Sequence, residues 1–321
     1  MPNTLAHLGI QTLATRGLIR DAEVKWIWAG CLLPDLPWIG QRALGATGLV
    51  DPLDLRLYAM AQASLFVSLA LAGALACLAA RPGRVFAILA FGCLTHLLLD
   101  AAQIKWANGV HLFAPFFWNI WNFGFFWPED WPTYALTALG AAVAAWAFWR
   151  RRETLADLVR PRGLRAAVFA ALALGWLALP VAFLGPAERS GSHHVDILRD
   201  PAARPGRAIG FDRDEVAFGA AGGPEIVAWT GERFAATGVL PPAPQTTPGG
   251  GSVPASLLGR FTDAATVEVA EVHVHAAGLR DYASYAGLAA VIGFWALALL
   301  RRPRRPAPPR SAPPRAGAGR G

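Results

Sequence analysis

Two ionisable residues stand four positions apart at the end of an apolar stretch, in the sequence THLLLD. A helix places positions i and i+4 on one face, so we expect His96 and Asp100 to point the same way. Gln103 extends that face, and the turn signal Asn108-Gly109 could bring His111 back towards it. Imidazole and carboxylate groups are typical zinc ligands, so this stretch predicts half of a metal site. The alternative is a polar helix end at a membrane surface, where His96 forms a cap or a hydrogen bond.

The composition is typical of an integral membrane protein. Hydrophobic residues make up 54% of the chain, charged residues only 16%, and there are 13 tryptophans. The formal net charge of +7 equals the seven arginines of residues 301–321, which contain no acidic residue, so residues 1–300 are neutral. A basic, proline-rich end predicts a disordered tail near an anionic membrane surface, and nucleic acid is not an expected partner.

The first forty residues lack the charged-then-apolar order and the cleavage site of a signal peptide, so we expect them in the mature protein. Residues 4–20 suit a helix along the membrane interface. Residues 26–40 are interrupted by two prolines and suit a re-entrant or interfacial segment. The three cysteines, Cys31, Cys77 and Cys93, have no CxxC spacing, so we expect small core residues and no disulfide framework.

About five transmembrane helices are predicted from length and apolarity, at 59–80, 85–104, 133–149, 164–185 and 283–300. Basic residues gather around 81–84, around 150–165 and in the tail, and the positive-inside rule places these regions in the cytoplasm. The connection 105–132 then faces outward, and its tryptophans suit an interfacial aromatic belt. This arrangement places the N-terminus outside a bacterial-type inner membrane, whereas a crossing at 26–48 would place it inside.

Between the last two predicted spans, the chain reads as a soluble β domain at residues 190–281. Alternating stretches predict five or six strands, with the loop 241–252 between two groups and a bulge near Ala270-Glu271. We expect an extracytoplasmic all-β domain shaped like the barrel of an OB-fold. The remaining parts are the membrane-embedded region 1–150, the basic loop and fourth span at 151–189, the last span at 282–300 and the tail at 301–321.

Further histidines lie in the β domain. His273 and His275 share one face of a predicted strand and could bind a metal ion. His193 and His194 could do the same together with Asp196. The alternative is that the first pair faces solvent from a strand and the second lies in a flexible loop.

Four short motifs occur in a particular order along residues 1–150. They contain His7 in LAHLGI, Asp35 in LPD, His96 and Asp100 in HLLLD, and His111 in GVHLFAPF. In this order they resemble the membrane-bound metal-dependent hydrolases, also described as LexA-regulated inner-membrane hydrolases, which are distantly similar to zinc-dependent phospholipase C. The resemblance implies that these five residues bind one or two Zn²⁺ ions, or another divalent metal.

The chain departs from that family at the start of the next helix. Many relatives have His-Arg and Thr-His-Ser motifs there, whereas this chain reads DPLDLRLYAMAQASL, without a histidine. Arg56, Tyr58 and Gln62 occupy the helix start instead. Asp51 or Asp54 could supply the missing carboxylate.

Two functions from different classes are consistent with these features. In the first, a zinc-activated water attacks an ester or phosphoester of a lipid-like or amphiphilic substrate at the outer membrane interface. Asp51 or Asp54 would act as the base, and Arg56 or Lys105 would bind an anionic head group. In the second, the protein is a non-catalytic membrane scaffold that displays its β domain, and the polar residues only satisfy one another.

Overall fold

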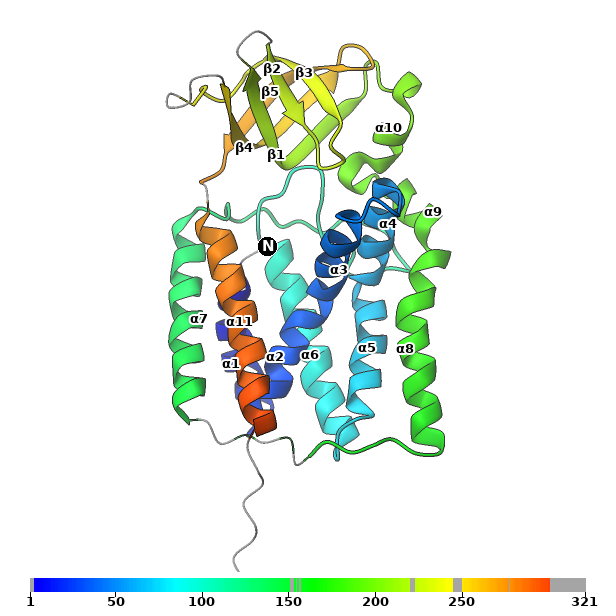
Figure 1. Ribbon diagram of the computed structural model, residues 1–321, viewed down its shortest axis with the longest axis vertical. Coiled ribbons are helices and arrows are strands. Elements are labelled where there is room, and N and C mark those ends of the chain that lie inside the picture. Colours follow the sequence, from blue (N-terminus) through cyan, green and yellow to red (C-terminus); the bar gives the residue numbers. More distant parts are fainter. Residues whose placement is uncertain are drawn as a thin grey trace, which may run out of the picture.

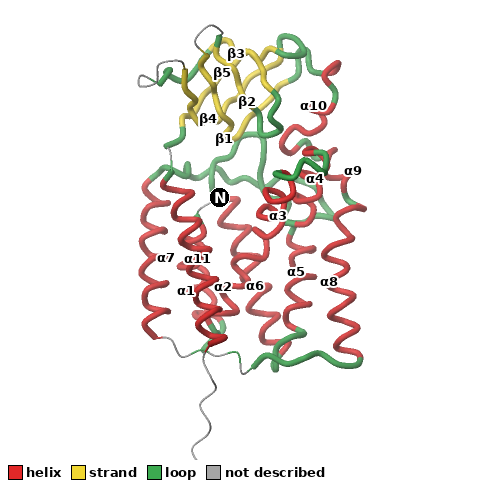
Figure 2. Tube along the Cα trace, viewed as in Figure 1, coloured by secondary structure: helices red, strands yellow, loops and turns green. Residues whose placement is uncertain are grey.

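The computed structural model shows a bundle of helices with a small β-barrel on one end (Figure 1). It describes residues 3–150, 153, 155, 157–219, 223–244, 250–276 and 278–300, so the predicted tail at 301–321 lies outside the described residues. Figure 2 separates the two parts by colour, with strands in the barrel and helices in the bundle. The expected mainly α-helical chain with a small, separate β domain is therefore confirmed.

The helices of the bundle run away from or towards the barrel, and α2 with α3 and α4 with α5 each continue in one direction (Figure 1). They are α1 (Thr4–Leu18), α2 (Val24–Leu32), α3 (Leu36–Gly45), α4 (Pro52–Gln62), α5 (Leu65–Ala76), α6 (Pro82–Ala101), α7 (Trp131–Arg150), α8 (Leu164–Ala182) and α11 (Leu279–Leu300). A 3-10 turn, η1 (Leu33–Asp35), joins α2 to α3. The link from α8 to the barrel consists of α9 (Leu184–Arg189), η2 (Ser192–His194), α10 (Val195–Arg199) and η3 (Pro201–Ala203).

Fewer helices than predicted have the length and apolarity of a membrane span. Among the described residues, α6, α8 and the stretch Arg280–Leu300 of α11 qualify, or up to four spans if α4 and α5 count together. The predicted span 59–80 was wrong as a single helix, because α4 and α5 meet at a 67° bend. Helix α7 covers the predicted span 133–149 and has 20 residues, but its polar first turn, Trp131-Pro132-Thr133-Tyr134, lowers its hydropathy.

Residues 4–20 were expected to form a helix along the membrane interface, but α1 lies inside the bundle. Helix α1 is inserted between α2, α6, α7 and α11, and buries His7, Gln11 and Thr15 along its length. Small residues permit this insertion, because a side chain at Gly140 of α7 or Gly287 of α11 would collide with the α1 backbone around Leu5. The polar face of α1 is thus directed into the protein.

A second close contact sets the distance between α2 and α6. A Cβ atom at Gly92 of α6 would lie 3.0 Å from the backbone of Gly30 in α2. Asp35, in η1, follows Gly30 by about one helical turn, and His96, in α6, follows Gly92 by about one turn. The prolines expected to interrupt this region end α2 at η1, and they thereby turn Asp35 towards α6.

The barrel contains five strands, within the predicted number. They are β1 (Ala208–Gly219), β2 (Pro224–Val227), β3 (Arg233–Gly238), β4 (Gly250–Phe261) and β5 (Thr266–Val274). The closed order is β1-β2-β3-β5-β4, antiparallel except for the pair β3–β5, and buried residues such as Phe211, Phe234 and Phe261 fill the interior. Leu258 pairs with Glu271 and Gly259 with Val269, so Ala270 is the residue of the predicted bulge.

The contact between Gly30 and Gly92 predicts a clear difference between two glycine substitutions in α6. Gly92→Ala should destabilise the protein by about 1–3 kcal/mol, because the added methyl group overpacks the α2–α6 contact. Gly83→Ala is the matched control, since nothing lies within 4 Å of its Cβ position, and it should leave stability unchanged or raise it by up to about 1 kcal/mol. Thermal unfolding in detergent measures both, and equal stabilities would contradict the close contact.

Candidate functional site

Four of the five predicted metal ligands meet at the end of the bundle below the barrel. His7 Nε2 lies 3.2 Å from Asp100 Oδ1. His96 Nε2 lies 3.4 Å from Asp35 Oδ1 and 3.7 Å from Asp100 Oδ2. The two imidazole rings are stacked, with their centres 4.1 Å apart. Residues from α1, η1 and α6 thus form one cluster, which we call the His/Asp cluster.

The His/Asp cluster is deeply buried and incompletely hydrogen-bonded. His7 and His96 are 0% and 1% exposed, and Asp35 and Asp100 are 8% and 5% exposed. Among the described residues, His7 Nδ1, both ring nitrogens of His96 and Asp35 Oδ1 have no hydrogen-bond partner. Buried polar atoms normally have partners, and each one left without costs about 1–3 kcal/mol. Two imidazoles and two carboxylates with unused lone pairs therefore fit a divalent metal such as Zn²⁺.

Cys31 joins this group, although we expected only a small core residue. Its Sγ and one ring nitrogen each of His7 and His96 all lie within 4.8 Å of one another. Cys31 precedes Asp35 by four residues in the same helical run, which is the spacing that also signalled His96 and Asp100. That spacing is visible in the sequence, where the lack of CxxC spacing favoured a small core residue.

His111 lies on the same cavity as Asp100 but apart from the rest of the cluster. No hydrogen bond or ion pair in the described structure joins it to the other four predicted ligands, and its ring lies 5.6 Å from that of Trp118. Burial lowers the pKa of His111 to about 4, so the imidazole is neutral at neutral pH. The expected turn at Asn108-Gly109 is not formed, because the chain bends at Trp106 and Ala107 instead. His111 still lies on the cavity wall, and its place in the metal shell stays a prediction.

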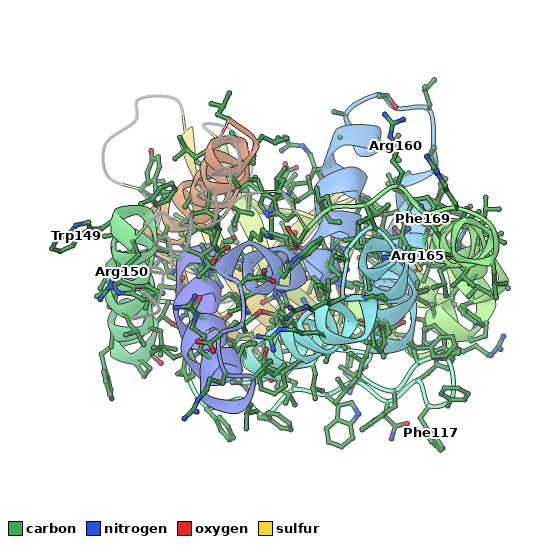
Figure 3. The ribbon with its side chains drawn as sticks, turned by 90° about the horizontal axis from the view of Figure 1, so that it is seen from below. Phe117, Trp149, Arg150, Arg160, Arg165 and Phe169 are labelled. Atoms are coloured by element: carbon green, nitrogen blue, oxygen red, sulfur yellow. The ribbon has the colours of Figure 1, made fainter. Side chains whose placement is uncertain are left out.

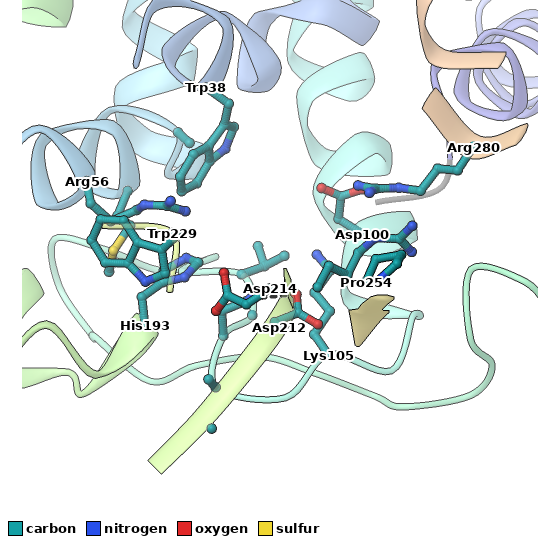
Figure 4. A pocket seen from close by; sticks show the side chains of 18 of the residues that line it. Trp38, Arg56, Asp100, Lys105, His193, Asp212, Asp214, Trp229, Pro254 and Arg280 are labelled. Atoms are coloured by element: carbon teal, nitrogen blue, oxygen red, sulfur yellow. Dashed lines mark hydrogen bonds between the residues drawn. The ribbon is translucent and has the colours of Figure 1, made fainter. Parts of the chain in front are cut away.

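A cavity of about 660 Å³ separates the bundle from the barrel (Figure 4). Asp100 lies at its wall, so the cavity gives access to the His/Asp cluster. Lys105 and Arg280 lie close to Asp100 in this view. The barrel closes the opposite side of the cavity with residues of β1 and of the β2–β3 turn, among them Asp212, Asp214 and Trp229. The site is thus shared between the two parts of the chain.

The two carboxylates proposed as the base do not lie on this cavity. Asp51 is the N-cap of α4, where Oδ1 accepts hydrogen bonds from the amides of Leu53 and Asp54. Asp54 Oδ1 pairs with Arg199 Nη2 at 2.7 Å on the surface. We therefore assign both to helix capping and surface pairing. Arg56, the third residue predicted to take part in catalysis, does line the cavity.

A second group of metal-binding residue types connects the bundle to the barrel. His275 Nδ1 lies 3.0 Å from Glu129 Oε1, and Ser256 Oγ lies 2.7 Å from His275 Nε2. Arg213 Nη1 donates to Glu129 Oε1 at 2.8 Å. Burial alone would raise the pKa of Glu129, but His275 and Arg213 hold it at about 2. His275 is only 3% exposed, so it does not face solvent. Because Arg213 already pairs with Glu129, we interpret the group as a polar interface.

His273 belongs to the same interface, where its ring stacks on that of Trp127 with centres 3.7 Å apart. The predicted group of His193, His194 and Asp196 is not brought together as a metal site among the described residues. His193 instead lines the cavity between bundle and barrel.

Comparison of the chain with models of protein families, with curated proteins and with solved structures finds no match.

Proposed function

We propose that the protein is a membrane-embedded, metal-dependent hydrolase that cleaves an ester or phosphoester of an amphiphilic substrate. One observation carries this proposal: His7, Asp35, His96 and Asp100 come from three separate segments and converge in one buried cluster that opens onto a cavity. Buried carboxylates and imidazoles without full hydrogen bonding are costly, and a metal ion compensates that cost. The resemblance of the sequence motifs to metal-dependent hydrolases supports the same conclusion.

The residues of the site have distinct roles in this proposal. His7, Asp35, His96 and Asp100 would hold one or two Zn²⁺ ions, with His111 and Cys31 as further candidate ligands. A bound zinc ion lowers the pKa of a coordinated water, which supplies a nucleophile at neutral pH. Lys105 lines the cavity beside Asp100, where its ammonium group can attract and orient an anionic substrate.

The apolar surface of the bundle supports insertion into a membrane. In α8 only 6% of the most apolar window is buried, so most of this stretch is at least partly exposed. The connection between α6 and α7 exposes large aromatic side chains near the barrel, including Phe116 at 71%, Phe117 at 67% and Phe125 at 72%. Aromatic residues of this kind favour the interface between lipid and water. The cavity thus lies at the depth of lipid head groups, which suits a lipid-like substrate.

The distribution of charge indicates the orientation of the chain. Figure 3 views the bundle from the end opposite the barrel, where Arg150, Arg160 and Arg165 lie. The N-terminal basic residues belong to this end too, because Arg84 Nη2 donates to Arg20 O at 2.7 Å and Lys25 Nζ lies 2.6 Å from Asp157 Oδ1. By the positive-inside rule this end is cytoplasmic. The barrel and the start of α1 are then on the outer side of the inner membrane.

Labelling with a membrane-impermeant maleimide tests this orientation. A cysteine introduced at Asp263, in the exposed β4–β5 turn, should react in intact cells, whereas one at Arg160 should react only after the membrane is opened. The three native cysteines are buried, so the unmodified protein supplies the background signal. Reaction of the Arg160 variant from outside would contradict the orientation.

Turnover of model substrates tests the hydrolase itself. The zinc-loaded protein in detergent should hydrolyse bis(p-nitrophenyl) phosphate or p-nitrophenyl butyrate, and a chelator should abolish the activity. His96→Ala should lower the rate by at least about 10–100-fold, because it leaves the metal shell incomplete. Asp54→Asn should retain normal turnover, because Asp54 pairs with Arg199 on the surface.

If protein with a normal thermal transition hydrolyses neither substrate in the presence of zinc, the non-catalytic scaffold is favoured. Loss of activity in Asp54→Asn would instead restore the base predicted from the sequence.

A further inference from the structure

The cavity contains a second polar group, formed jointly by the bundle and the barrel. The Arg56 guanidinium carbon, from α4, lies 4.1 Å from the ring centre of Trp229 and 5.7 Å from that of Trp38. The ring of His193 lies 6.0 Å from Trp38 and 6.2 Å from Trp229. Figure 4 shows Arg56, Trp229 and His193 gathered on one side of the cavity, with Asp214 beside them.

Arg56 is a charged group whose ordinary partner is missing from the described residues. No ion pair joins it to a carboxylate there, and its Nε has no hydrogen-bond partner. A guanidinium keeps its charge at any physiological pH, and leaving a mostly buried charge unpaired is unfavourable. Stacking on an aromatic ring uses the face of the guanidinium and leaves the N–H groups at its edge available for an oxyanion.

Asp214 supplies a second polar group on the same cavity, with one carboxyl oxygen left without a partner. It is 6% exposed, and its Oδ2 has no hydrogen-bond partner among the described residues. It stands where the pairing of β1 with β4 shifts register after Phe211, and such bulges redirect side chains. Burial raises the pKa of Asp214 to about 7, with Asp212 and Glu215 acting in the same direction and Arg56 against it. Near neutral pH, much of Asp214 is therefore a neutral carboxyl that can donate a hydrogen bond.

We propose that Arg56, held by Trp38 and Trp229, and Asp214 form an oxyanion-binding site for the phosphoryl group of a substrate. The planar guanidinium can donate to two oxygens of such a group, and a neutral carboxyl can donate to a third. A cationic ligand does not fit, because Arg56 already occupies the aromatic face. The site gives the β-barrel a defined role, since Asp214 and Trp229 come from the barrel.

This inference rests on the proposed function only in taking the occupant to be the substrate. Binding of the anion requires no hydrolysis and no metal, so it is measured on protein freed of metal by a chelator. Failure of the hydrolase proposal would leave binding intact. Failure of the oxyanion site would leave the metal cluster in place.

Isothermal titration calorimetry of the full chain with two probes tests the site. Inorganic phosphate represents a free anion, and dihexanoyl phosphatidylglycerol represents the head group of a lipid. Arg56→Gln should weaken binding at least about tenfold, because charged hydrogen bonds to the anion are lost. Asp214→Leu should also weaken it, whereas Asp214→Asn, which keeps a donor group, should bind within about threefold of the wild type.

Arg233→Gln is the matched control, because Arg233 pairs with Glu225 on the exposed surface of the same barrel. Binding of phosphate alone or of the lipid alone, sensitive to Arg56→Gln, would support the site and identify the source of the phosphoryl group. The proposal is overturned if neither probe binds the wild type. It is also overturned if Arg56→Gln and Asp214→Leu, with normal thermal transitions, bind like the wild type, or if Arg233→Gln weakens binding equally.

Discussion

The burial of two carboxylates against two imidazoles is the interaction on which the arrangement of the bundle depends. Asp35 and Asp100 lie within 3.4 Å and 3.7 Å of His96 in a part of the protein that water hardly reaches. Bringing such groups out of water costs several kcal/mol per ion, by order of magnitude, unless the geometry compensates it. The insertion of α1 and the close contact of α2 with α6 supply that geometry, and a bound metal would supply the charge balance.

Local spacing predicted His96 and Asp100, whereas His7 and Asp35 were expected as ligands only from the order of the motifs. The i, i+4 relation of His96 and Asp100 and the prolines beside Asp35 are encoded within a few residues, as is the bulge at Ala270. The insertion of α1 depends on Gly140 and Gly287, which are far from it in sequence and have no recognisable pattern. Apolarity alone could not reveal the bend between α4 and α5. The capping position of Asp51 and the surface pairing of Asp54 could not be foreseen, because a capping carboxylate and a catalytic carboxylate look alike in a sequence.

The barrel is more than a domain carried by the helical bundle. Its contact with the bundle runs through Glu129, Arg213, Ser256 and His275, which fix the position of β1 and β4 above the cavity. This fixed position brings Asp214 and Trp229 to the side of the cavity opposite the helices. Metal chemistry would then depend on the bundle, while recognition of the substrate would depend on both parts.

The metal content of the purified protein tests the central claim most directly. After zinc addition and removal of unbound metal, the wild type should hold one or two zinc ions per chain. His96→Ala and Asp100→Ala should lose nearly all of it, whereas Thr95→Ala should retain it, because the Thr95 hydroxyl only donates to carbonyls of its own helix. A well-folded wild type without bound zinc, or with zinc that is unaffected by the loss of His96 and Asp100, would contradict the account.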